Sequence, residues 1–178
     1  IRSRQAIIEA AFTLYESGNL VPTAQQVADQ SGLGIRTVFR HFSEMEKLYV
    51  EGDEILYKRY SELPVIHPDG SLQSRIDQLV TERAANCEMF APYIRATLVQ
   101  LWRYDLLRKN YQKLCDKFRK QALRFFPEME NQPADLVEAV DLALSFESWN
   151  HLRMHRGMSR KATIKTIKTT LTSLLKSA

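Results

Sequence analysis

Residues 23–42 read TAQQVADQSGLGIRTVFRHF, and they predict the fold of the chain more specifically than any other segment. Thr23 followed by Gln26 predicts the start of a short helix, because the pair forms a capping box in which each side chain bonds a backbone N–H of the other residue. Gly32 then provides the positive φ that ends this helix. A second short helix follows over about 35–42. Two short helices joined by a glycine-containing turn form a helix-turn-helix motif.

The second helix of the motif has two chemically different faces. At about 100° per residue, its apolar side chains share one arc and its polar side chains share another. The apolar arc holds Ile35, Val38, Phe39 and Phe42. The polar arc holds Arg36, Thr37, Arg40 and His41. We therefore expect one face to pack on a core and the other to face a partner.

The helices on both sides of the motif complete a small helical domain. Residues 2–17 carry apolar side chains at spacings of three and four, which indicates an amphipathic helix that stops at Gly18. Ser43 and Glu46 form a second possible capping box, which predicts a longer helix reaching Tyr60.

The remainder of the chain also has a helical pattern. The clearest break is 63–71, which contains two prolines and a glycine. We expect Pro92 and Pro133 to stand in first turns of helices. The predicted helices cover 72–89, 92–105, 106–126, 133–155 and 159–175, with a loop after Pro127.

Composition excludes several other classes of protein. The 178 residues include only six glycines and six prolines, too few for the many tight turns of an all-β domain. The longest stretch without a charged residue, Ser17 to Ala28, is far shorter than the ~20 apolar residues of a spanning helix, so we expect no membrane partner. The net charge is +4, yet residues 1–50 carry equal numbers of acids and bases. Bulk charge therefore identifies no nucleic-acid domain.

A family resemblance becomes specific when the motif is taken together with the helix before it. Residues 8–15 (IEAAFTLY), Thr23, Val27 with Ala28, 31–33 (SGL) and 37–42 (TVFRHF) resemble the DNA-binding domain of the TetR family of transcriptional repressors. The resemblance covers about the first 50 residues. It implies an all-α chain with a DNA-binding domain over 1–50, whose helix-turn-helix spans about 23–42, and a helical ligand-binding and dimerisation domain over 51–178.

The resemblance also implies a function. It predicts a ligand-responsive repressor in a bacterial cytoplasm that binds a palindromic double-stranded DNA operator as a homodimer, with no enzymatic activity and no cofactor. The effector is not identified, although an apolar or aromatic molecule suits the aromatic residues of the second domain. The alternative from another class is a helical adaptor or enzyme-like module that uses the helix-turn-helix for protein contacts.

Four residues align with base-reading positions of the family. Gln25 could offer its amide to adenine, and Arg36 could bond guanine O6 and N7. Thr37 or Ile35 could touch a thymine methyl group, although periodicity points Ile35 inward. A solvated surface is the alternative for Gln25 and Arg36, and a core position is the alternative for Ile35.

Phosphate contacts are expected from the next turn and from the following helix. Arg40 and His41 are expected to hold phosphates, which fixes the register of the protein on DNA. Phe39 stands where family members usually have a phosphate-binding Tyr; it lacks the hydroxyl and can only pack. Met45 replaces a usual Lys, for which Lys47 is a possible substitute. A solvated face is the alternative for the polar side chains, and core for Phe39.

Candidate ligand and dimer residues lie in the second half of the chain. We expect Tyr93, Trp102 and Phe118 to contact the effector, with an ordinary core as the alternative. The last two long helices of the family form a dimer interface, which predicts interface roles for Leu144, Trp149, Leu152, Ile167 and Leu171. The acid-free residues 159–175 could also attach to an anionic membrane, but their many threonines favour a solvated face.

Two further groups of residues could form a metal site or a reactive thiol site, but another interpretation is favoured for each. Glu147, His151 and His155 share a helical face and could bind a metal, but a polar surface row is the favoured interpretation, and Leu152 excludes an HExxH motif. Cys87 and Cys115 form no CxxC pair and are predicted to be buried thiols. We predict neither a metal site nor a catalytic site.

Overall fold

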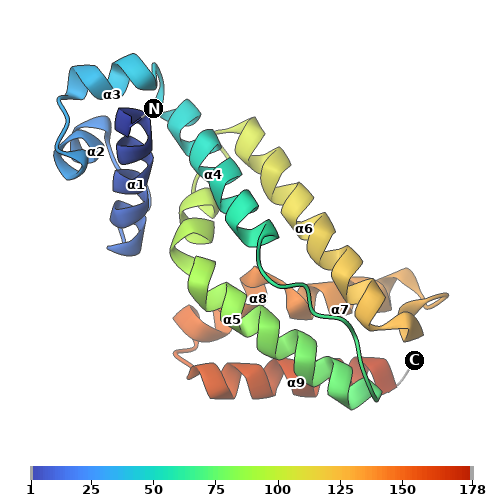
Figure 1. Ribbon diagram of the computed structural model, residues 1–178. Coiled ribbons are helices and arrows are strands. Elements are labelled where there is room, and N and C mark those ends of the chain that lie inside the picture. The colour runs from blue at the N-terminus through green and yellow to red at the C-terminus, as the bar shows by residue number, and fades with distance from the viewer. Residues whose placement is uncertain (1, 177–178) are drawn as a thin grey trace. The chain divides into compact units, whose positions relative to one another are not determined.

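The computed structural model describes residues 2–176, and all regular structure in that range is helical, which confirms the all-α prediction (Figure 1). The elements are α1 (Arg2–Glu16), α2 (Ala24–Ser31), α3 (Ile35–His41), α4 (Met45–Ser61), α5 (Leu72–Leu98), α6 (Asp105–Phe125), the 3₁₀ helix η1 (Pro127–Met129), α7 (Ala134–Leu144), α8 (Phe146–Asn150), the π-helix η2 (His151–His155) and α9 (Arg160–Lys176). None of the described helices is long and apolar enough to cross a membrane.

The chain folds into two compact units. The first unit combines the chain up to Leu63 with Phe90–Leu114, and the second combines Pro64–Met89 with the chain from Cys115 onward. Helices α5 and α6 each belong partly to one unit and partly to the other, with the division after Met89 in α5 and after Leu114 in α6. The two units are therefore joined by continuous helix as well as by the segment after α4.

The core of the first unit is built from the apolar stripes that the sequence predicts for α1 to α3. α1 contributes fully buried Ile7 and Ile8, α3 contributes Val38, and the C-cap of α3 contributes Phe42. The same cluster includes Leu107 of α6. Residues beyond the first fifty therefore help to close the core against which α3 packs.

Helix ends in the motif follow the capping chemistry of its residues. The Thr23 hydroxyl accepts a hydrogen bond from the Gln26 N–H at 3.2 Å, and the Gln26 side chain accepts one from the Thr23 N–H at 2.9 Å, which confirms the predicted capping box. Gly32 ends α2 with φ of 68°, a left-handed conformation that most other residues adopt only at a cost. Local sequence therefore fixes both ends of α2.

The second predicted capping box, at Ser43 and Glu46, is wrong. α4 begins at Met45, and its N-cap Glu44 forms no side-chain capping bond. Ser43 lies one residue too early to cap this helix, and its hydroxyl instead accepts a hydrogen bond from Nζ of Lys47 at 2.8 Å.

Helix α5 corrects the prediction of two helices meeting near Pro92. It runs unbroken from Leu72 to Leu98, with Pro92 in its interior. A proline removes one backbone hydrogen bond and strains the preceding turn. Phe90, Ala91 and Ala96 on either side are buried, so tertiary packing keeps the helix continuous across that defect.

The predicted helix over 133–155 is also wrong, because the chain breaks at Ser145. That residue has extended dihedrals (φ −69°, ψ 158°), and its hydroxyl accepts a hydrogen bond from the Ser148 N–H at 3.1 Å, which caps α8. Pro133 precedes α7 as its N-cap instead of standing in its first turn. The loop predicted after Pro127 contains the short η1.

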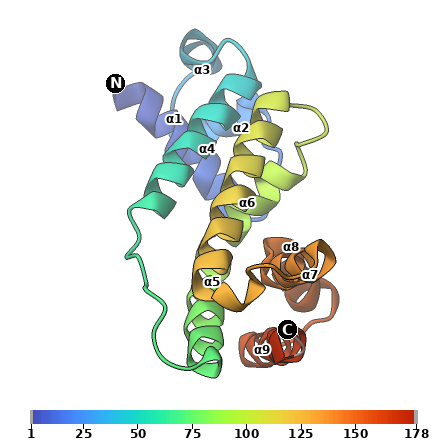
Figure 2. The same ribbon diagram turned by 90° about the vertical axis from the view of Figure 1, so that its right-hand side faces the viewer.

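In the second unit α5 lies next to α9 (Figure 2), and two of its charged side chains bond other segments of that unit. Arg83, a buried residue, donates to the Phe118 carbonyl at 2.8 Å and lies 4.2 Å from the centroid of the Phe118 ring. Arg153 of η2 pairs with Glu88 at 2.7 Å. Such part-buried pairs fix how the surrounding helices pack on the first half of α5.

Candidate nucleic-acid interface

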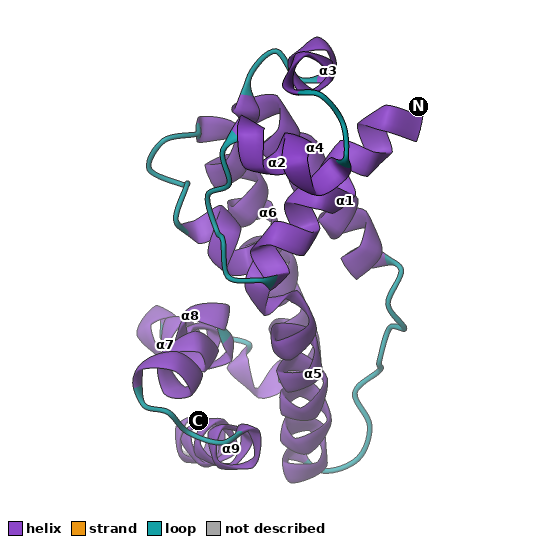
Figure 3. Cartoon of the chain, turned by 90° about the vertical axis from the view of Figure 1, so that its left-hand side faces the viewer, coloured by secondary structure: helices purple, strands orange, loops and turns teal. Residues whose placement is uncertain are grey.

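Helix α3 lies at one end of the first unit (Figure 3), and its basic side chains are exposed. Val38 and Phe42 are fully buried and anchor it, whereas Arg36 and Arg40 are exposed and Thr37 is half-buried. Among residues 2–176, no acidic side chain forms a salt bridge with either arginine. Both guanidinium groups are therefore available to an anionic partner.

Two apolar residues of α3 differ in their burial. Ile35 is half-buried and packs against the core, as its periodicity predicts. Phe39 is 48% exposed, so its alternative assignment to the core is wrong. Phe39 and Val38 form opposite edges of the apolar arc, and only the Val38 edge meets the neighbouring helices. The Phe39 ring thus adds an apolar contact surface beside Arg40.

Arg4 of α1 holds the end of α3 in place, a role that was not predicted from the sequence. Its Nη1 donates to the His41 carbonyl at 2.9 Å, and its Nε bonds the Glu51 carboxylate of α4 at 2.8 Å. The guanidinium carbon also lies 4.4 Å from the centroid of the Phe42 ring. The available signal was that Arg4 shares the apolar stripe of Ile8, so its side chain had to point toward the neighbouring helices.

The predicted contact residues outside α3 already have partners within the chain. The exposed Gln25 donates from its amide to the Asp29 carboxylate at 2.7 Å. The exposed Lys47 bonds the Ser43 hydroxyl, and Met45 is half-buried against the core. Both bonds join exposed residues four apart in the chain, where each is weak enough to exchange for a stronger contact.

The structure does not assemble the three predicted ligand residues into one pocket. Tyr93 is half-buried, with its ring 5.3 Å from that of Phe12, and its phenol bonds the Glu16 carboxylate. Trp102 is 80% exposed. Phe118 belongs to the second unit, beneath the guanidinium of Arg83.

Tyr93 lines a small internal cavity of about 10 Å³ in the first unit, enough for one water-sized group. Asp53 also lines it, and burial raises the pKa of that carboxyl group although Thr97 donates to it at 3.4 Å. The Gln100 side-chain oxygen nearby is buried without a hydrogen bond from the described residues. The carboxyl group of Asp53 is therefore a titratable group in the interior of the first unit.

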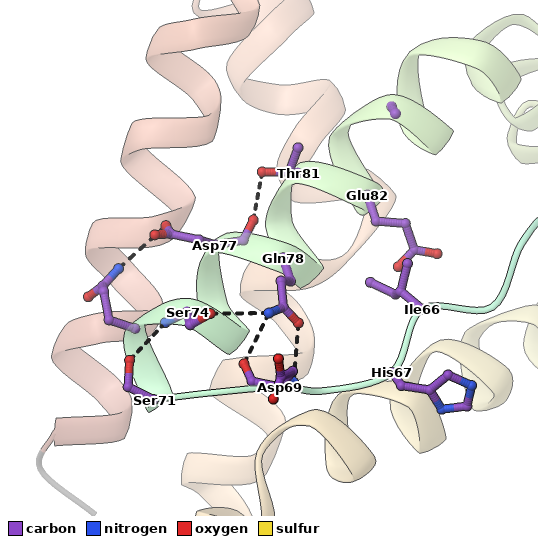
Figure 4. Close-up of a pocket in the computed structure, with 11 residues that line it drawn as sticks. Ile66, His67, Asp69, Ser71, Ser74, Asp77, Gln78, Thr81 and Glu82 are labelled. Carbon is purple, nitrogen blue, oxygen red and sulfur yellow. Dashed lines mark hydrogen bonds between the residues drawn. The ribbon is translucent and has the colours of Figure 1, made fainter.

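A separate groove of about 1000 Å³ lies in the second unit, between the segment before α5 and the first half of α5 (Figure 4). Gln78 spans it by donating to the Asp69 carbonyl at 3.0 Å. Glu82 lies on its wall, and burial raises the pKa of this carboxyl group. None of the three predicted ligand residues lines the groove.

Four of the five predicted dimer residues belong to the chain's own core. Leu144, Trp149, Ile167 and Leu171 are buried, and Leu152 is half-buried. A side chain buried within one chain has no apolar area left for a partner, so these four are corrected to core positions. The same part of the chain instead exposes Leu142 and Met154.

Neither remaining candidate forms a functional cluster. The rings of His151 and His155 lie 5.7 Å apart on an exposed surface, and among residues 2–176 no three His, Cys, Asp or Glu side chains gather as a metal site would require. Cys87 and Cys115 form no disulfide and are half-buried, less than predicted. Desolvation raises the pKa of Cys87 to about 12, which keeps it protonated and unreactive.

Comparison with solved structures gives matches over nearly the whole chain. A transcriptional regulator from Rhodococcus sp. Rha1 aligns with a TM-score of 0.67 at 17% identity, covering 98% of this chain and 97% of that one. A TetR transcriptional regulator from Rhodococcus sp. RHA1 aligns with a TM-score of 0.52 at 16% identity, covering 99% and 98%. By sequence, the chain matches no protein-family model and no curated protein. Its helical architecture, from the helix-turn-helix through α9, is therefore the fold of TetR-type transcriptional regulators.

Proposed function

We propose that the chain is a TetR-like transcriptional regulator, not an enzyme, that binds double-stranded DNA through α3. The observation that carries this proposal is the outward face of α3, where Arg36 and Arg40 are exposed without acidic partners. Val38, Phe42 and the Arg4 clamp hold that face in one orientation. A rigid helix with two cations on one side fits the major groove of DNA, which is about 12 Å wide.

Within the site, base recognition is assigned to the first turn of α3 and to α2. Arg36 is proposed to bond guanine, Thr37 and the edge of Ile35 to contact thymine methyl groups, and Gln25 to exchange its bond to Asp29 for one to adenine. A bidentate contact of the arginine type discriminates between bases by about 1–3 kcal/mol.

Phosphate binding is assigned to the second turn of α3 and to the start of α4. Arg40, His41 and Lys47 are proposed to hold phosphates, and the exposed Phe39 ring to pack on the sugar backbone. These contacts position the helix and carry little sequence information.

The regulatory part of the proposal concerns the assembled protein. Residues 1–50 are proposed as the DNA-binding domain and 51–178 as the domain that binds the effector and forms a homodimer in the bacterial cytoplasm. Two copies of α3 about 34–36 Å apart would then read a palindromic operator. An apolar or aromatic effector relieves repression only if it binds the arrangement that cannot dock on DNA more tightly than the one that can.

Selection of bound duplexes from random DNA tests the proposal. The expected result is a near-palindromic site bound by a dimer, with affinity that falls steeply as salt rises, by a power of about −0.9 for each phosphate neutralised. A protein adaptor would enrich no sequence. A monomer both in solution at micromolar concentration and on DNA would contradict the dimer assignment.

A further inference from the structure

The turn between α5 and α6, residues 99–104, exposes an unusual amount of apolar surface. Trp102 is 80% exposed, more than any other large apolar side chain in residues 2–176. Val99 and Leu106 are also exposed beside it. The indole Nε1 donates to the Val99 carbonyl at 3.1 Å, so the ring is held in place while its faces stay open. Exposed apolar surface of this kind indicates an interaction site.

This turn is fastened to the helix-turn-helix. The ring of Tyr104 lies 5.8 Å from that of Tyr49 in α4. The Tyr49 hydroxyl in turn donates to the Pro22 carbonyl at 3.1 Å, directly before Thr23, the cap of α2. In Figures 1, 2 and 3 the turn lies at the same end of the first unit as α3 and the start of α4.

The charges around Trp102 favour an anionic partner. Arg103, Arg108 and Lys109 are exposed, and the one nearby acid, Asp105, pairs with Arg108. Within residues 2–176, neither Arg103 nor Lys109 forms a salt bridge. The Arg103 guanidinium lies 5.2 Å from the centroid of the Tyr104 ring, which holds it at the end of the same turn. An exposed aromatic ring followed in the chain by an arginine and by a lysine of the next helix suits a nucleic-acid backbone, because the ring packs on sugars or bases while the cations meet phosphates.

We infer that the α5–α6 turn is a second DNA contact of the same unit, outside the base pairs that α3 reads. Trp102 packs against the sugar-phosphate backbone, and Arg103 and Lys109 neutralise phosphates. The inference rests on the proposed function and extends it, since this surface adds affinity for any duplex without adding sequence preference. It also makes the first half of α6 part of the DNA-binding surface.

Tryptophan fluorescence tests the contact directly. The chain has two tryptophans, and Trp149 is buried, so Trp149→Phe leaves Trp102 as the single probe. Addition of the duplex selected by the wild type is expected to lower acrylamide quenching of Trp102 by about twofold or more, as for a ring covered by DNA. In the matched variant Trp102→Phe, DNA is expected to leave the quenching of Trp149 unchanged. If Trp149→Phe fails to fold, the difference in quenching between the wild type and Trp102→Phe reports on Trp102.

Measurements of DNA affinity provide a second test of the proposed contact. Trp102→Ala and Arg103→Ala are each expected to weaken binding by about 3–30-fold on all duplexes alike, and Arg103→Ala to reduce the salt exponent by about 0.9. Lys58→Ala removes the same charge from an exposed position near the end of α4, and should bind as the wild type does.

Three results would overturn the inference. They are wild-type affinity in both variants, unchanged quenching on addition of DNA, and protection of Trp102 that rises with protein concentration in the absence of DNA, which would make the turn an interface between copies. In each case the wild type still selects a DNA site, so only the second contact fails. If the wild type selects no site at all, the proposed function fails first.

Discussion

At the residue scale, Arg4 is the side chain that links the position of α3 to the rest of the first unit. It bonds the last residue of α3 through the His41 carbonyl and bonds α4 through Glu51. Arg4→Ala is expected to lower the free energy of unfolding by about 1–3 kcal/mol, because bonds to a charged group are lost. It should also weaken DNA binding on every sequence.

Urea unfolding and a binding titration check the Arg4 prediction, with Arg2→Ala as the control. Arg2 lies two residues earlier on α1, is exposed and carries the same charge. Equal unfolding midpoints for Arg4→Ala and the wild type would contradict the clamp.

Asp53 gives a residue-scale prediction about pH. Burial raises the pKa of its carboxyl group in the folded chain, so the folded state holds this proton to higher pH than the unfolded state does. Stability from this group therefore falls as pH rises from the unfolded pKa, about 4, through the raised folded pKa. Asp53→Asn stays neutral and can still accept a hydrogen bond from Thr97. The stability of Asp53→Asn relative to the wild type is expected to increase with pH over that window.

The measurement for Asp53 is the free energy of unfolding of both proteins at a series of pH values from 4 to neutral. A difference between them that stays constant with pH would show that the carboxyl group titrates alike in the folded and unfolded states. Asp69→Asn offers a matched control on an exposed residue.

At the element scale, the N-cap of α2 is expected to contribute strongly to the stability of this short helix. The helix has eight residues, too few to be stable in isolation, so its ends and its packing decide its stability. Thr23→Ala is expected to lower the free energy of unfolding by about 1 kcal/mol, because the Gln26 N–H loses its partner. Thr23→Ser keeps the hydroxyl and should restore most of that loss in the same urea titration. Identical stabilities of all three proteins would show that the capping bond is not formed.

The same scale shows how much of the fold could be predicted from sequence. Helix type and position followed from apolar spacing in α1 to α4, because strong turn signals separate those helices. The continuity of α5 through Pro92 and the break at Ser145 could not be predicted, because both depend on packing between distant segments. Leu144 and Trp149 were misassigned for the same reason: periodicity identifies a buried face without identifying what buries it.

The candidate site was predictable only in part. Arg36 and Arg40 followed from the polar arc of α3, and their exposure agrees with it. The Arg4 clamp and the exposed turn around Trp102 were not found, since each depends on contacts between residues far apart in the sequence. The bond from Gln25 to Asp29 was also missed, although its spacing of four residues is visible in the sequence.

At the scale of the whole molecule, the fold says less about function than the exposed side chains of α3 do. Regulators with 16% and 17% identity share the architecture, so most positions of the sequence can change while the helices keep their arrangement. A fold of this kind fixes where a DNA-reading helix stands, and only its exposed side chains decide which bases it reads. Arg36 is therefore the residue whose replacement is most informative.

The most direct test compares wild type, Arg36→Ala and Arg40→Ala on the selected site and on all of its single-base variants. Arg36→Ala is expected to lose about 10–100-fold in affinity for the selected site and to lose its preference at one base position per half-site. Arg40→Ala should weaken binding to every duplex alike and leave the preferences intact. If Arg36→Ala keeps the wild-type preference at every position, the outward face of α3 does not read DNA.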